Sequence, residues 1–75
     1  MNKELKKLIK SRISESEEQA KFWGEKVDNY TKNIIAGPAT AELKLARQQC
    51  IGQKDKFTAI AEFGNELLDF IKSKD

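Results

Sequence analysis

Two pairs of carboxylates have the spacing that acid–base chemistry could use. Glu15 with Glu18, and Glu62 with Glu66, stand three or four residues apart, so each pair would share one face of a helix. General acid–base catalysis most often uses histidine, and the chain contains none. Both pairs fall outside the apolar pattern, so we interpret them as solvated surface. We therefore expect no catalytic residues and no enzymatic activity.

A single cysteine, Cys50, is the other reactive side chain. It has no disulfide partner within the chain, and one thiol without histidine does not make a zinc site. Its place in the apolar pattern is typical of a small buried side chain. We expect no metal and no cofactor. A free thiol and an N-terminus without a secretion signal favour a cytoplasmic location.

The first dozen residues are basic and could contact phosphate. Five cations lie there: Lys3, Lys6, Lys7, Lys10 and Arg12. They carry our alternative hypothesis, a small nucleic-acid-binding regulator that uses this segment. The absence of interleaved aromatics, the acidic residues of 15–18 and a net charge of only +2 disfavour it. No apolar run is long enough to span a bilayer. The apolar residues opposite the lysines are already used by the apolar pattern between the helices, so we expect no binding to a membrane surface either.

Two stretches of helical periodicity carry these residues. The only proline stands at Gly37-Pro38, near the middle of the chain, where one helix must end and another can begin. Apolar residues recur in steps of three and four on both sides of it. This predicts an all-α fold, a single domain over 1–75, with helices over about 2–35 and 39–73 and a turn over about 36–39. Two such stripes can satisfy each other as an antiparallel, coiled-coil-like hairpin.

The two stripes and the turn predict which residues face each other. The first stripe is Ile9, Ile13, Ser16, Ala20, Trp23, Val27, Tyr30 and Ile34; the second is Leu43, Ala46, Cys50, Gln53, Phe57, Ile60, Gly64, Leu67 and Ile71. With a turn centred near Gly37, the numbers of facing residues sum to about 73. The facing pairs then include Trp23 with Cys50, Ile13 with Ile60 and Ile9 with Gly64. We expect Trp23 in the core, with an exposed anchor for a partner as the competing interpretation. A bend is possible at Ser14, which begins a capping pattern, or at Gly52.

The chain has more apolar residues than one hairpin can bury. They concentrate near the two chain ends, and five form our candidate interface: Leu5, Leu8, Phe63, Leu68 and Phe70. The last helix is apolar on nearly all sides, and such a helix is expected to be buried on all sides. A chain of 75 residues also builds only a small core. The sequence therefore predicts a homo-oligomer, a four-helix bundle or larger assembly, with a different protein partner as the other option.

Several features follow one another along the chain: Trp23 in the first helix, a short turn, Leu45-Ala46-Arg47-Gln48, Gly52, and an apolar stretch over Phe57 to Ile60. This layout resembles small helical-hairpin proteins encoded by tailed phages and prophages. The resemblance implies a phage accessory or virion-associated protein that acts by binding, in the host cytoplasm or the virion. The residues themselves favour a non-catalytic protein-interaction module, acting through helical surfaces as adaptor, inhibitor or assembly factor.

Overall fold

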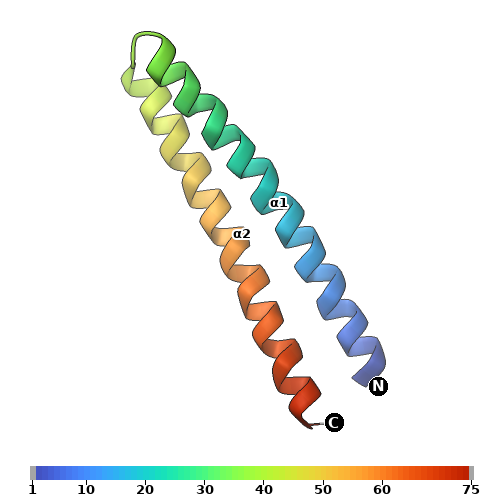
Figure 1. The fold of residues 1–75 in the computed structure, drawn as a ribbon. Helices are drawn as coiled ribbons and strands as arrows, with labels where there is room; N and C mark the ends of the chain where they lie inside the picture. The colour runs from blue at the N-terminus through green and yellow to red at the C-terminus, as the bar shows by residue number, and fades with distance from the viewer. Residues whose placement is uncertain (1, 75) are drawn as a thin grey trace.

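Two long helices make up the molecule. The computed structural model describes residues 2–74, in which α1 spans Asn2–Ala36 and α2 spans Ala41–Lys74. Figure 1 shows the helices side by side and antiparallel, with the turn at one end and both termini at the other. The predicted all-α hairpin is confirmed. Met1 and Asp75, which the predicted domain includes, lie outside the described residues.

A cap on the second helix closes the turn. The N–H of Gly37 donates to the carbonyl of Asn33 (3.1 Å), which is the last turn of α1. Thr40 Oγ1 accepts a hydrogen bond from the N–H of Leu43 (3.2 Å), as the side chain of an N-cap residue does. Because Thr40 is the cap, α2 begins at Ala41, two residues later than the sequence pattern predicts.

Both helices run without interruption through the two positions where a bend was considered, Ser14 and Gly52. The result is a rod with extents of 56 × 14 × 14 Å. Its radius of gyration is 16.9 Å, whereas a compact chain of this length would have about 11 Å. The hairpin therefore has much surface for its mass.

The core is a narrow strip between the helices. Six of the described residues are buried: Ile9, Ile13, Ser16, Cys50, Ala61 and Leu68. No described side chain is completely buried. The main apolar cluster is at the end that carries both termini, which we name the open end; it joins Ile9 and Ile13 to Ala61 and Leu68. Burial is thus strongest far from the turn.

The helices pair about one helical turn away from the predicted register. A Cβ atom built on Gly64 would lie 2.6 Å from Cγ1 of Ile13, and Arg47 Nε donates to Thr31 Oγ1 across the helices at 2.7 Å. The numbers of these facing residues sum to 77 and 78, so the predicted sum of about 73 is wrong. The reason is the turn: residues 37–40 lie outside both helices, which moves its midpoint beyond Gly37.

The buried side of α2 also departs from the predicted heptad stripe near the open end. Ala61 and Leu68 are buried, whereas Ile60 is 42% exposed. A straight helix has 3.6 residues per turn, so a strict heptad stripe drifts about 20° per heptad around it. Counted from Leu43, the straight-helix period arrives at positions 61 and 68, while the heptad period arrives at 60 and 67. The contact stripe of α2 therefore follows the straight-helix period.

Candidate functional site

Large apolar side chains gather on one side of the open end. We name this surface the open-end face; it consists of Leu5, Leu8, Ile60, Phe63, Leu67 and Ile71. The first four are between 42% and 64% exposed. Leu67 and Ile71 are half-buried, because they also pack against the core cluster. The face is therefore supported from beneath by the best-packed part of the hairpin.

A shared groove shows that both helices contribute to the same side. Arg12 and Gln19 of α1 line a groove of about 400 Å³ together with Ile60 of α2. Leu5 and Leu8 precede Arg12 in steps of three and four, so they continue its row along α1 to the open end. On α2 the other members of the face follow Ile60 in the same steps. The two rows thus run in parallel on one side of the molecule.

The other side of α2 is acidic at this end. Glu62, Glu66 and Asp69 are exposed and recur in steps of four and three, about half a turn away from the row that begins at Ile60. The prediction that the last helix is apolar on nearly all sides is therefore wrong. At this end of α2, the exposed apolar side chains lie on the side that carries Ile60 and on the outer edge of that side.

Four of the five predicted interface residues are exposed. Leu5, Leu8 and Phe63 belong to the open-end face, and Phe70 lies at its outer edge, one heptad after Phe63. Leu68 is 6% exposed and packs between the helices, so its assignment to an interface is wrong. The straight-helix period turns Leu68 toward α1. The same rotation exposes Ile60, which the heptad stripe had placed in the core. Counting 3.6 residues per turn along the sequence would have predicted that Ile60 belongs to the exposed surface.

Four of the five predicted phosphate contacts lie together on α1. One shallow hollow of about 330 Å³ is lined by Lys3, Lys6, Lys7 and Lys10, with Glu4 beside them. Arg12 is separate from these lysines, because it lines the groove next to the open-end face and forms an exposed ion pair with Glu15 (3.8 Å). The basic segment is therefore divided between two surfaces of α1.

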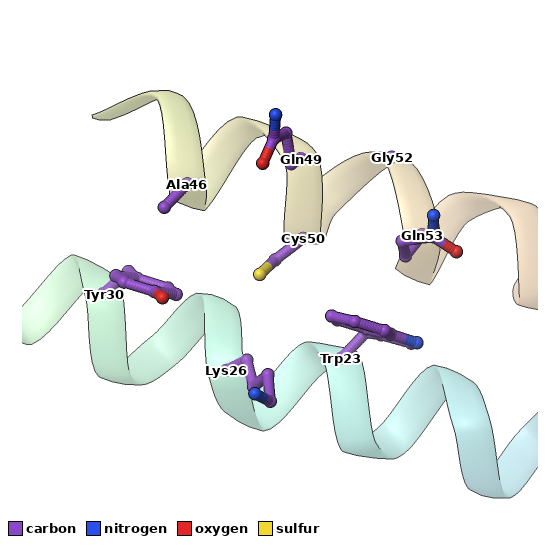
Figure 2. A pocket seen from close by; sticks show the side chains of 8 residues that line it. All are labelled: Trp23, Lys26, Tyr30, Ala46, Gln49, Cys50, Gly52 and Gln53. Carbon is purple, nitrogen blue, oxygen red and sulfur yellow. The ribbon is translucent and has the colours of Figure 1, made fainter. Parts of the chain in front are cut away.

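A second groove lies at mid-length, with a volume of about 560 Å³. Figure 2 shows Cys50 of α2 pointing across to α1, between the rings of Tyr30 and Trp23. Cys50 is buried, in agreement with its interpretation as a small apolar side chain. The amide side chains of Gln49 and Gln53 complete the groove on α2.

Trp23 lies at the edge of the core. Its ring is half-buried and meets the ring of Phe22 edge to face, with centroids 5.2 Å apart, while Lys26 Nζ is 5.7 Å from the Trp23 ring. The indole Nε1 is buried and has no hydrogen-bond partner among residues 2–74. An unpaired buried N–H is destabilising by about 1–3 kcal/mol. Trp23 was predicted to lie in the core, and the structure places only part of its side chain there.

Within residues 2–74, no three acidic or cysteine side chains come together as a metal ion would require. Neither helix, over the same residues, has a stretch long and apolar enough to cross a membrane. No protein-family model, curated protein or solved structure matches the chain. The resemblance to phage-encoded hairpin proteins stays a prediction.

Proposed function

We propose that the chain is a non-catalytic protein-interaction module that binds through the open-end face. The observation that carries this proposal is the gathering of four exposed large apolar side chains on one side of one end. An apolar patch bordered by polar residues is typical of a protein-binding site. Such a mode of action suits an adaptor, an inhibitor or an assembly factor.

The shape of the face favours a helical partner. Its two rows follow neighbouring antiparallel helices, and a groove of about 400 Å³ continues between these rows toward mid-length. An amphipathic helix can lay its apolar stripe along such a groove, with side chains at helical spacing as anchors. Phe63, the most exposed member of the face, is the side chain that such a partner would cover most readily.

Site-specific photo-crosslinking tests the proposal. A benzophenone amino acid would replace Phe63 in one variant and Ile35 in another, in the cells that naturally make the chain. Ile35 is the matched control because it is 80% exposed and lies near the turn, in a hollow with Lys44. We expect protein adducts from position 63 and none from position 35. An absence of any protein adduct at position 63 would contradict the proposal.

The gathering of four lysines in one hollow supports a second candidate function, nucleic-acid binding through Lys3, Lys6, Lys7 and Lys10. Binding of this kind weakens steeply with salt, because cations on the protein release counterions from the phosphates. Fluorescence anisotropy with labelled DNA and RNA at several salt concentrations is the test. The candidate requires salt-sensitive binding that is lost when Lys3, Lys7 and Lys10 are changed to glutamate.

A further inference from the structure

We infer that the open-end face is covered by the open-end face of a second copy of this chain. The two copies would be related by a two-fold axis parallel to the helices, giving an antiparallel four-helix bundle. This inference rests on the proposed function and names the partner of that surface.

The exposed area of the single hairpin supports a partner of this size. The chain exposes 5901 Å², whereas a compact protein of its mass exposes about 4,700 Å². The excess of about 1,200 Å² is spread along the whole rod, and two hairpins that pack side by side could bury from it the roughly 800 Å² that each partner contributes to a standard interface. No described side chain is completely buried, so one hairpin has little core of its own. A second copy is present wherever the chain is made, so it can supply the missing core.

The symmetry brings apolar rows together. An axis parallel to the helices keeps the open ends at the same level and places α1 of one copy over α2 of the other. With facing numbers that sum to about 77, Leu8 is level with residue 69 of α2. Leu8 of one copy would then pack on Leu67 and Ile71 of the other. The same contact occurs twice, as in any self-complementary two-fold interface.

The charges at the edges of the face select this orientation. Exposed Glu4 and Glu15 lie at its outer edge on α1, and exposed Lys56 and Lys74 lie at its outer edge on α2. With α1 over α2 and facing numbers that sum to about 77, Glu4 of each copy is level with Lys74 of the other, whereas Glu15 pairs with Arg12 of its own chain (3.8 Å). A two-fold axis perpendicular to the helices would stack α1 on α1 and place like charges together. Exposed pairs contribute little affinity, so they fix the orientation rather than the strength of association.

Sedimentation equilibrium at micromolar concentration tests the inference, with three forms of the full chain: wild type, Leu8→Lys and Ile35→Lys. Leu8 is 56% exposed and Ile35 is 80% exposed, so neither change removes core packing, and circular dichroism checks that helicity is kept. We expect the wild type and Ile35→Lys to have the mass of a dimer. Leu8→Lys should raise the dissociation constant roughly tenfold or more, because it places a charge in the centre of the contact.

A monomeric wild type, or a dimer that Leu8→Lys and Ile35→Lys affect equally, would overturn the inference. Its failure is distinguishable from failure of the proposed function. A monomer that still crosslinks from position 63 to a different protein would keep the interaction module and exclude the second copy. A monomer without any adduct would overturn both.

Discussion

Gly64 of α2 lies directly against Ile13 of α1. A Cβ atom on Gly64 would be 2.6 Å from Cγ1 and 3.1 Å from Cδ1 of Ile13, and Ile13 is itself buried. These distances leave no room for a methyl group. The contact limits how closely the helices approach at the open end, and it is consistent with the register that the turn and the cap at Thr40 set.

Gly64→Ala should cost about 1–3 kcal/mol through overpacking, since Ile13 must move out of its packed position. The gain in helix propensity of about 1 kcal/mol offsets part of this, so the free energy of unfolding should fall by up to about 2 kcal/mol. Gly52→Ala is the matched control. Apart from the backbone of its own helix and its two chain neighbours, nothing within residues 2–74 lies within 4 Å of a Cβ at Gly52, which is inside the same helix. The control should raise the free energy of unfolding by about 1 kcal/mol through helix propensity alone. Urea unfolding at one fixed protein concentration measures both, and equal effects would show that Gly64 does not contact α1.

Thr31→Val should remove the hydrogen bond that joins the helices near the turn. Thr31 Oγ1 donates to the carbonyl of Val27 (2.8 Å) and accepts from Arg47 Nε (2.7 Å). Because Arg47 is charged and half-buried, we expect a loss of about 1–2 kcal/mol in the free energy of unfolding. Thr58→Val is the control, since the hydroxyl of Thr58 is exposed and donates to the carbonyl of Lys54 in its own helix (2.9 Å). A control loss as large as that of Thr31→Val would contradict the role of this contact.

Trp23 should tolerate phenylalanine better than alanine. Trp23→Phe removes the buried N–H that has no partner and keeps an aromatic ring beside Phe22, so stability should change by less than about 1 kcal/mol. Trp23→Ala should cost about 2 kcal/mol, less than a fully buried aromatic would, because the ring is half-buried. Chemical unfolding followed by circular dichroism measures both. An unchanged stability of Trp23→Ala would favour the competing interpretation of an exposed anchor.

Cysteines at the edges of the open-end face should join two copies. We expect a disulfide between a Glu4→Cys chain and a Lys74→Cys chain when the two are mixed, both in a Cys50→Ala background. The reason is that α1 of one copy would lie over α2 of the other. Non-reducing electrophoresis and mass spectrometry detect the product. Disulfides that form only between two Glu4→Cys chains would instead indicate the perpendicular two-fold axis.

The sequence was sufficient to predict the two helices. Gly37-Pro38 marks the turn. The row from Ile9 to Ile34 fits periods of 3.5 and 3.6 residues equally well, so either period predicts correctly which side of α1 faces α2. The two periods diverge only along α2, where the heptad count selects Ile60 and the structure buries Ala61. The register depended on the cap at Thr40, a local contact that the apolar pattern does not encode. The difference in period explains why Leu68 was assigned to the surface and Ile60 to the core, and the cap explains the error in the register.

The most direct test of the account is whether Leu8 of one copy touches α2 of another. An isotope-filtered nuclear Overhauser experiment on a mixture of labelled and unlabelled chains sees contacts between copies and no others. We predict such contacts from the Leu8 methyl groups to Leu67 and Ile71, and none from the Ile35 methyl groups. If Leu8 makes no contact with a second copy, or if Ile35 makes such contacts instead, the proposed dimer through the open-end face is wrong.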